Sequence, residues 1–274
     1  MATFLNEYRI RLPFTLEEYQ IGQLYSVGEA SKDETGGGEG WKWVKNEPFE
    51  GVIPHDKGGV PRKGQYTEKI LYLGTKFPNQ FRCLARQSVF EVLEKSWNCY
   101  PYIVTEYTNP SYMKENFQMV ITSLHNSGTN IEENVFGLNE GQLKERSVDL
   151  LDIVNDFSDM RDFKASEDPS HFQSKKDARG LLKGAYWIHD QPSAVTVYKM
   201  VETKLSWNGW ESKLNDMFQK TVKRTLLRFN RKVFCSMDQW LSLNIGDVRK
   251  FENEVKKELD SKRDQGTVIG TRES

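Results

Sequence analysis

Hydrophobic and polar residues alternate with a period of two in several short segments of the chain. In residues 6–12, apolar side chains at every second position alternate with charged ones, which predicts a half-buried β-strand that ends before Pro13. The pattern of residues 148–154 fits more than one element, and a strand is favoured by three hydrophobic residues of one parity, Val148, Leu150 and Val154. Further strands are predicted at residues 66–73, 102–107, 117–124 and 194–205.

Helical periodicity, in which apolar residues recur at intervals of three and four, marks three other segments. Residues 15–31 predict a helix that opens with a capping box formed by Thr15 and Glu18. A long amphipathic helix is predicted over residues 212–240, with a break shortly before its end. The last predicted helix covers residues 244–262.

The segments between these elements are polar or rich in glycine and proline, which predicts exposed connections at residues 33–40, 51–64 and 125–142. Many strands followed by long helices predict an α+β fold, in which a curved and mostly antiparallel β-sheet carries helices on one face. Residues 1–262 are expected to form a single domain, and residues 263–274 a flexible C-terminal tail.

Three charged residues interrupt otherwise apolar faces of these elements. Lys199 lies in the middle of a valine-rich strand face, Lys69 shares a face with Thr67 and two leucines, and Glu252 lies within the apolar stripe of the last helix. A charge is rarely buried without a partner, because the loss of hydration costs several kcal/mol. One hypothesis is an internal ion pair of Lys69 or Lys199 with Glu252. The other is an apolar cavity whose polar end holds a phosphate or hydroxylated group, and the pattern alone leaves both open.

Composition and charge narrow the class of protein. The chain has 274 residues, of which 37% are hydrophobic and 28% charged, so that a sizeable core is possible beneath a polar surface. The net charge of −1 gives no global attraction to nucleic acid, and no nucleic-acid partner is expected. Three cysteines far apart fit a reducing compartment. The first residues carry charges where a signal peptide needs apolar ones, and no apolar run is long enough to span a membrane, so a cytoplasmic protein is expected.

The sequence carries no recognisable catalytic or metal-binding signature. The four histidines are scattered without the spacing of a zinc site, and neither a GxSxG motif nor a catalytic cysteine signature occurs. The three glycines at 36–38 lack the Lys-Ser/Thr pair of a phosphate-binding loop. No enzyme activity, catalytic residue, metal or cofactor is therefore expected.

Basic residues gather on the long predicted helix, where residues 220–232 contain six of them and no acidic residue. A solvated helix face is one explanation, and attraction to an anionic membrane, at about 1 kcal/mol per basic residue near the surface, is the other. Aromatic residues near basic ones either insert into a membrane interface or pack against the body of the protein. The candidates for insertion are Trp207, Trp210, Phe77 and Phe81.

Several longer motifs occur together in a fixed order. They are EYRIRLP (7–13), EEYQIGQLYSVGEASKDETGGGEG (17–40), NEP (46–48), GQYTEK (64–69), WNCYPY (97–102), YMKENF (112–117) and YKMV (198–201). This set resembles the single-domain class I phosphatidylinositol transfer proteins from about residue 5 to about residue 262. The resemblance implies a START-like helix-grip fold whose sheet and helices enclose one phospholipid. It also implies a monomeric carrier that associates transiently with membrane surfaces and exchanges phosphatidylinositol against phosphatidylcholine.

The resemblance implies roles for particular residues. The family's inositol-binding positions correspond to Thr67, Lys69, Asn98 and Glu252. Its phosphate-binding positions correspond to Gln23, Thr105, Ser123 and Lys199, where Ser123 replaces a threonine of the family pattern. The family's regulatory phosphorylation site corresponds to Ser174.

The chain also departs from the family pattern at several positions. The membrane-inserting Trp-Trp pair of the family is Trp207-Asn208 here, with Trp210 close by to compensate. The family's reactive cysteine in the cavity is Ile103, so thiol reagents have no target at this position. The stretch 51–62 is longer than in the family pattern.

Two other classes of protein are alternatives. An enzyme such as a phosphoinositide hydrolase would use a similar cavity, but it needs a nucleophile–base pair or a metal cluster, for which the sequence has no motif. A carrier of another hydrophobic ligand, such as a sterol, would not need two lysines and a glutamate facing inward.

Overall fold

The computed structural model describes residues 1–56, 58–73, 91–156, 164–207 and 209–264. Its strands are β1 (Ala2–Leu12), β2 (Gly40–Val52), β3 (Pro61–Tyr72), β4 (Glu91–Cys99), β5 (Tyr102–Thr108), β6 (Phe117–Ser127), β7 (Ser147–Leu151) and β8 (Val195–Leu205). Its α-helices are α1 (Leu16–Asp33), α3 (Glu140–Glu145), α4 (Glu211–Cys235), α5 (Met237–Trp240) and α6 (Ile245–Asp264). Short 3-10 helices lie at Lys114–Asn116, Ala165–Glu167 and Trp187–Asp190.

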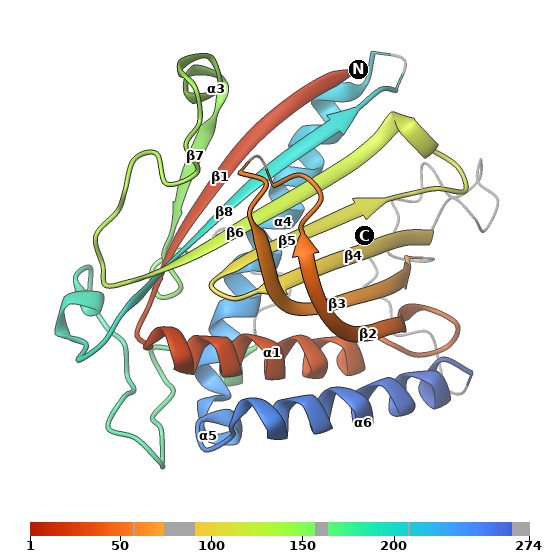
Figure 1. The fold of residues 1–274 in the computed structure, drawn as a ribbon. Coiled ribbons are helices and arrows are strands. Elements are labelled where there is room, and N and C mark those ends of the chain that lie inside the picture. Colours follow the sequence, from red (N-terminus) through yellow and green to blue (C-terminus); the bar gives the residue numbers. More distant parts are fainter. Residues whose placement is uncertain (57, 74–90, 157–163, 208, 265–274) are drawn as a thin grey trace.

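The described strands form an eight-stranded sheet in the order β2-β3-β4-β5-β6-β8-β1-β7. Neighbouring strands are antiparallel except β1 and β7, which run parallel. Figure 1 shows the strands curving over α1 and α6, which lie side by side, while α4 passes along the sheet behind them. This arrangement confirms the predicted α+β, START-like fold with a curved, mostly antiparallel sheet.

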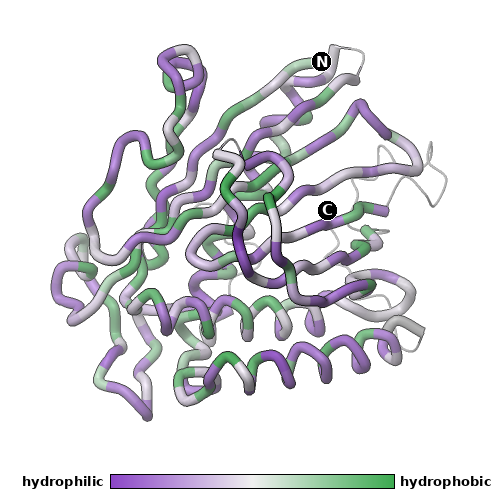
Figure 2. The backbone as a smooth tube through the Cα atoms, viewed as in Figure 1, coloured by the Kyte–Doolittle hydropathy of each residue, from purple (hydrophilic) through white to green (hydrophobic). Residues whose placement is uncertain are grey.

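The long helices pack against one face of the sheet. The Tyr8 hydroxyl of β1 donates a hydrogen bond to Gln219 of α4 over 2.7 Å, and the rings of Tyr19 in α1 and His125 in β6 are 5.2 Å apart. At the other end of the sheet, Trp43 of β2 packs in one cluster with hydrophobic residues of α6. Figure 2 shows hydrophilic residues over most of α6 with hydrophobic ones recurring along it, as expected of a helix with one buried stripe.

Close approach between the helices depends on two glycines of α1. A Cβ atom on Gly22 would lie 2.7 Å from the ring of Trp240, and one on Gly28 would lie 2.5 Å from the ring of Phe251. Both distances are shorter than atoms in contact allow, so that any larger side chain would push α5 and α6 away from α1.

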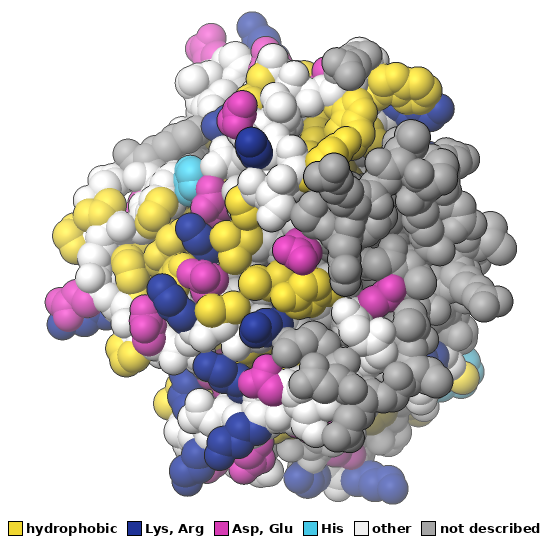
Figure 3. Space-filling view, turned by 90° about the vertical axis from the view of Figure 1, so that its right-hand side faces the viewer, with side chains coloured by type: hydrophobic (Ala, Val, Ile, Leu, Met, Phe, Trp, Pro, Cys, Tyr) yellow, Lys and Arg dark blue, Asp and Glu magenta, His cyan; other side chains and the backbone are white. Residues whose placement is uncertain are grey.

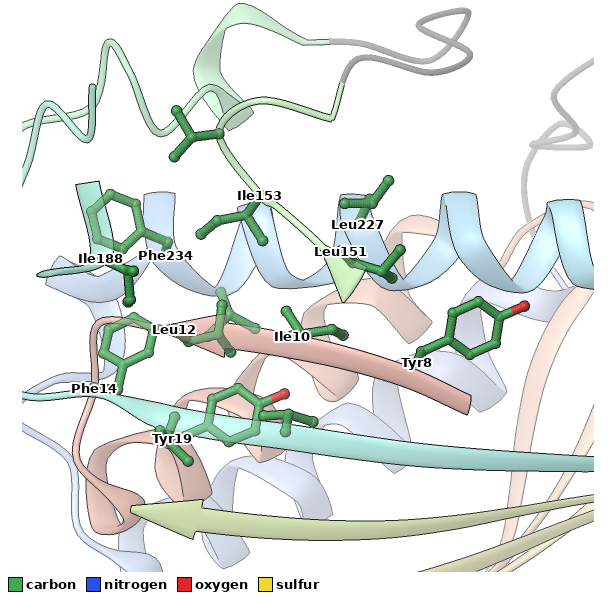
Figure 4. Packing of buried hydrophobic residues seen from close by; sticks show 14 of the residues in the cluster. Tyr8, Ile10, Leu12, Phe14, Tyr19, Leu151, Ile153, Ile188, Leu227 and Phe234 are labelled. Atoms are coloured by element: carbon green, nitrogen blue, oxygen red, sulfur yellow. The ribbon is translucent and has the colours of Figure 1, made fainter. Parts of the chain in front are cut away.

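The main hydrophobic core lies between α4 and the strands toward the β7 end of the sheet. Ile10 and Leu12 of β1 and Phe234 of α4 are completely buried, and Figure 4 shows Ile10 and Leu12 on the side of β1 that faces Leu151 and Ile153. The alternation that predicted a strand at residues 6–12 therefore places its apolar side chains in this core.

Most elements predicted from the sequence are present. The helix over residues 15–31 is α1, and its capping box of Thr15 and Glu18 is confirmed. The long helix breaks after Cys235, as predicted, and the last helix ends at Asp264, two residues beyond the predicted end. Residues 265–274 of the predicted tail lie outside the described residues.

Two predicted connections are shorter than expected, and the strand β2 was missed. The connection predicted at 51–64 covers only residues 53–60, because β2 and β3 form a long hairpin, and β6 extends into the connection predicted at 125–142. A bulge between Trp43 and Lys45 interrupts the period of two along β2, which hid this strand.

The strand at 148–154 exists only as far as Leu151. Val148 and Leu150 are exposed, and the buried residue is Leu151, so the predicted inward parity is wrong. The physical reason is that β7 is an edge strand paired only with β1, and Val154 lies in the turn that follows it.

Candidate functional site

The sheet register brings six of the predicted site residues into three neighbouring cross-strand rows on the helix-covered face. Thr67 of β3 lies opposite Ser96 of β4, which lies opposite Thr105 of β5, and the Ser96 and Thr105 hydroxyl oxygens are 2.9 Å apart. The row one pleat further along contains Asn98, Ile103, Ser123 and Lys199, and the row on the other side contains Lys69 and Glu94. Residues that alternate along a strand and pair across it point to the same side, so these side chains share one face.

Lys69 forms a buried ion pair that the sequence did not predict. Its Nζ lies 3.0 Å from Oε1 of Glu94, directly opposite in the sheet, and both side chains are 8% exposed. The ammonium also lies 4.5 Å from the ring centroid of Trp43, within the range of a cation–π interaction. Burial, followed by the Glu94 carboxylate, raises the pKa of the neighbouring Tyr107 well above its usual value.

Glu252 connects the last helix to the hairpin of β2 and β3. Its side chain is buried, and its Oε2 accepts hydrogen bonds from Arg249 over 2.7 Å and from Asn46 over 3.3 Å. Asn46 lies opposite Thr67 and accepts in turn from Gln65 over 2.7 Å. The hypothesis that Glu252 pairs with Lys69 or Lys199 is therefore wrong, because its basic partner is Arg249.

Lys199 has a different environment from Lys69. Its Nζ donates a hydrogen bond to the Ser123 hydroxyl over 2.9 Å, and no carboxylate of the described residues pairs with it. Burial lowers the pKa of Lys199 from 10.5 to about 8. The residue is half-buried, and a largely desolvated ammonium without a neutralising carboxylate is a suitable site for an anion.

Gln23 of α1, the remaining predicted phosphate-binding residue, is buried. Its Nε2 has no hydrogen-bond partner within the part of the chain that the structure describes. A buried donor of this kind is costly to leave unpaired, and such atoms commonly mark a ligand or water site.

The predicted phosphorylation site, Ser174, is buried and fully engaged in local hydrogen bonds. Its hydroxyl donates to the Asp238 carboxylate and accepts from the backbone N–H groups of Lys176 and Asp177 over 3.1 and 2.9 Å. A phosphate at this position would meet the Asp238 carboxylate, so that modification requires this loop to open first.

Half of the six basic residues in the run on α4 form ion pairs within the protein. Lys223 pairs with Asp149 over 2.8 Å, Arg228 pairs with Glu167 over 3.5 Å, and Lys232 pairs with Asp33. Arg231 is buried and donates to a backbone carbonyl. Attraction to an anionic membrane is weaker here than the count of basic residues suggested, because these charges already have partners.

Aromatic rings are exposed at the start of α4. The side chain of Trp210 is 53% exposed, and the half-buried Trp207 packs against Tyr112 with 6.0 Å between ring centroids. Figure 3 looks onto this end of the molecule and shows hydrophobic side chains at its upper edge beside a basic one. Phe77 and Phe81, the other predicted insertion residues, and Asn208 lie outside the described residues.

A separate pocket of about 200 Å³ opens on the opposite face of the sheet. It is lined by residues of the other parity, among them Leu5, Tyr102, Met200 and Glu202. Its volume is below the roughly 300–1,000 Å³ typical of pockets for small organic ligands, so it does not suit a diacyl phospholipid.

The described part of the chain offers neither a metal cluster nor a membrane-spanning helix. No group of three or more metal-ligating side chains gathers there. Cys99 and Cys235 are free thiols, and Cys83 lies outside the described residues. Among the helices that the structure describes, none combines the length and the apolar character needed to cross a membrane.

Sequence reasoning missed Glu94 and Asn46, which complete the polar site. Both lie on strands that were not predicted. In β4, polar residues at 94, 96 and 98 occupy the inward face where a core strand would carry apolar ones, so the expected alternation is reversed. The signal that would have found Glu94 is its shared parity with Asn98, four residues further along the chain.

The fold and the site define a helix-grip protein with charged groups between its sheet and its helices. Comparison with known proteins shows to which family this chain belongs. The family profile described as phosphatidylinositol transfer protein matches residues 3–257. The phosphatidylinositol transfer protein beta isoform of Homo sapiens is 42% identical over 273 residues, covering 97% of each chain. Phosphatidylinositol transfer protein 2 of Dictyostelium discoideum is 40% identical over 262 residues, covering 95% of this chain and 97% of its own. The chain belongs to the phosphatidylinositol transfer protein family.

Proposed function

We propose that this protein is a phospholipid transfer protein that binds one phosphatidylinositol or phosphatidylcholine molecule beneath its helices and exchanges it between membranes. Membership of the family supports phospholipid transfer. The observation that carries the lipid site is Lys199, a half-buried lysine whose largely desolvated ammonium contacts Ser123 but no carboxylate of the described residues. The phosphate common to both lipids would supply the missing negative charge, together with hydrogen-bond acceptors for Gln23 and Thr105.

The inositol ring is assigned to the part of the site formed by β3, β4 and α6. Lys69, Thr67, Asn98 and Glu252 offer donors and acceptors there, and the charge of Lys69 is already balanced by Glu94. A site with balanced charge and many hydrogen-bonding groups suits a neutral polyol, whereas the choline group has no hydroxyl to donate. Selectivity between the two lipids would therefore arise in this part of the site.

Transport through water explains why a carrier would enclose its lipid. A diacyl lipid alone would expose roughly 30 methylenes at about 0.8 kcal/mol each, a prohibitive cost. Release at a membrane requires an opening element, and α6 is the candidate lid. It is held to the β2–β3 hairpin by the Glu252–Asn46 bond and by Lys256, which donates to the Val44 carbonyl over 3.3 Å.

The carrier would act in the cytoplasm as a monomer without metal, cofactor or catalysis, and would dock transiently on membranes through Trp207 and Trp210. The exposed ring of Trp210 and the contact of Trp207 with Tyr112 support this docking surface.

The experiment loads purified protein from mixed liposomes, re-isolates it and identifies the bound lipid by mass spectrometry. Lys69→Ala is loaded in parallel, with Lys63→Ala as the matched control because Lys63 lies on the same strand but is exposed. We expect one lipid per chain, with phosphatidylinositol weakened by about 1.5–3 kcal/mol in Lys69→Ala, phosphatidylcholine unchanged and the control like the parent.

Other outcomes would contradict the proposal at different points. Equal loss of both lipids in Lys69→Ala would refute the headgroup assignment. An empty parent protein, or one carrying a sterol, would refute the phospholipid assignment, and hydrolysed lipid in the eluate would indicate an enzyme.

A further inference from the structure

His125 lies next to the phosphate-binding residues without having been assigned a role. It follows Ser123 by two residues on β6 and therefore points to the same face, and its backbone pairs with Val197, two residues before Lys199. The residue is 1% exposed. Its imidazole thus lies inside the protein beside the Lys199–Ser123 pair.

The ring of His125 is held between two tyrosines whose hydroxyls bind elsewhere. Its centroid is 5.2 Å from that of Tyr19 and 5.1 Å from that of Tyr100. The Tyr19 hydroxyl donates to Asn230 over 2.9 Å, and the Tyr100 hydroxyl donates to the Leu16 carbonyl over 2.6 Å. These contacts fix the plane of the imidazole but satisfy neither of its nitrogens.

Both ring nitrogens of His125 lack a hydrogen-bond partner among the described residues. Packing alone does not explain a histidine here, since phenylalanine would make the same ring contacts without a buried unpaired donor. Burial, followed by the nearby Lys199, lowers the pKa of His125 well below its usual value, so the imidazole is neutral and carries one N–H donor.

Gln23 adds a second unsatisfied nitrogen to the same region. It lies one helical turn after Tyr19 on α1, and Tyr19 contacts His125. Its Nε2, like the nitrogens of His125, has no partner within the described chain. Donors from α1 and β6 thus lie in the same region as the Lys199 ammonium of β8, which has no carboxylate partner in the described structure.

We infer that His125 is a further ligand-binding residue, whose imidazole N–H donates a hydrogen bond to a phosphate oxygen of the bound lipid beside Lys199. This inference rests on the proposed function. The phosphate group is common to phosphatidylinositol and phosphatidylcholine, so His125 would strengthen binding of both without selecting between them. A free phosphate ion offers the same acceptor, and the experiment separates the two sources.

The test compares His125→Phe with His189→Phe, because both histidines pack against tyrosine rings but His189 is exposed. Each protein is first stripped of lipid. The melting temperature is measured on one sample, and a second sample is titrated with vesicles containing phosphatidylinositol or phosphatidylcholine. We expect His125→Phe to bind both lipids at least about tenfold more weakly, the effect of losing one hydrogen bond to a charged group. Its lipid-free melting temperature should be unchanged or higher, since a buried unpaired polar group has been removed.

Imidazole ¹⁵N resonances give a readout that a purely structural role would not move. The His125 signals are assigned by their loss in His125→Phe and are followed in the parent protein, empty, with each lipid, and with inorganic phosphate. A shift of one ring nitrogen with both lipids supports the inference, and a further shift with inorganic phosphate would show that the phosphate group suffices.

Unchanged ring resonances on loading, or full lipid affinity in His125→Phe, would overturn the inference while leaving the carrier intact. A parent protein that takes up neither lipid would instead refute the proposed function, so the two failures are distinguishable. A large fall in the melting temperature of lipid-free His125→Phe would assign the imidazole to the fold and overturn the inference.

Discussion

Lys69 and Lys199 extend from the same face of one sheet, but their surroundings differ. Lys69 faces Glu94 at 3.0 Å and the ring of Trp43 at 4.5 Å, so its charge is balanced inside the protein. Among the described residues, Lys199 contacts the Ser123 hydroxyl at 2.9 Å and no carboxylate, and burial lowers its pKa to about 8. The two lysines are separated in the sheet by β4, β5 and β6.

The difference between the two lysines teaches what each can bind. A balanced ion pair has donors to offer but little net charge, which suits hydroxyl groups. An unbalanced ammonium in a buried place destabilises the empty protein and is relieved by an anion, which suits a phosphate. One sheet face thus provides separate positions for the two parts of an inositol phospholipid headgroup.

The largest effect is expected from breaking the balanced pair. Lys69→Met leaves the Glu94 carboxylate buried without its partner, which should lower the free energy of unfolding by about 3–5 kcal/mol. Adding Glu94→Gln removes the stranded charge and should recover most of this loss. Urea unfolding of both lipid-free variants measures the difference. Equal losses in the single and double variants would show that the two residues do not depend on each other.

The unbalanced lysine should make the lipid-free protein more stable in alkali. Between about pH 8 and its unfolded pKa of 10.5, Lys199 holds a proton in the unfolded chain that the folded chain has lost, so the free energy of unfolding rises with pH. At about 1.4 kcal/mol per unit of pKa, the gain is at most about 3 kcal/mol. Denaturant unfolding of the parent and Lys199→Met at pH 7 and pH 10 isolates this contribution.

Lys199→Met is expected to be the more stable protein at pH 7, and its advantage should shrink as the pH rises. If the two proteins differed by the same free energy of unfolding at pH 7 and pH 10, Lys199 would keep its proton throughout. Its environment would then not differ from that of Lys69 in the way described.

The next effect concerns ligand choice. Lys199→Met should weaken phosphatidylinositol and phosphatidylcholine alike by about 1.5–3 kcal/mol, because both lose a charge-assisted hydrogen bond to phosphate. The Lys69→Met/Glu94→Gln protein should weaken phosphatidylinositol alone. The measurement is the amount of each bound lipid, quantified by mass spectrometry after competitive loading. Identical lipid selectivity in the two proteins would show that the lysines do not bind separate parts of the headgroup.

The smallest effect lies outside the candidate site and sharpens the comparison by separating lipid loading from membrane docking. Replacing Trp207 and Trp210 together by alanine should slow transfer between vesicles several-fold, because less aromatic surface enters the membrane interface. The amount of bound lipid should not change. Tyr186→Ala is the matched control, since its ring is 76% exposed and contacts the exposed His189 ring far from the start of α4 in the chain. A parental transfer rate in the tryptophan variant would exclude this docking surface.

Ile103 offers a test of how far the candidate site extends along the sheet. It lies between Asn98 and Ser123 in the sheet register, so Ile103→Cys places a thiol on the site face. A thiol reagent should block loading of this variant and leave the parent unaffected. Unhindered loading of the labelled variant would show that the site does not extend to this position.

Much of the fold was predictable because the relevant signals are local. The strand at residues 194–205 and the helices over residues 15–31 and 212–240 follow from side-chain periodicity within one element. The strands β2 and β4 were missed for physical reasons, since a bulge interrupts one and polar side chains face inward on the other. The departures from pattern therefore coincide with the candidate site, as expected where binding rather than core packing selects the residue.

The sequence by itself determined that Lys69, Lys199 and Glu252 lie on otherwise apolar faces, because that property depends only on the period of a strand or helix. Its motifs also indicated the family. Only the tertiary structure decided that Lys69 pairs with Glu94, that Glu252 binds Arg249 and Asn46, and that Lys199 has no carboxylate partner in the described structure. Partners are set by strand register and by the packing of α6 against β2, and these depend on contacts between residues far apart in the chain.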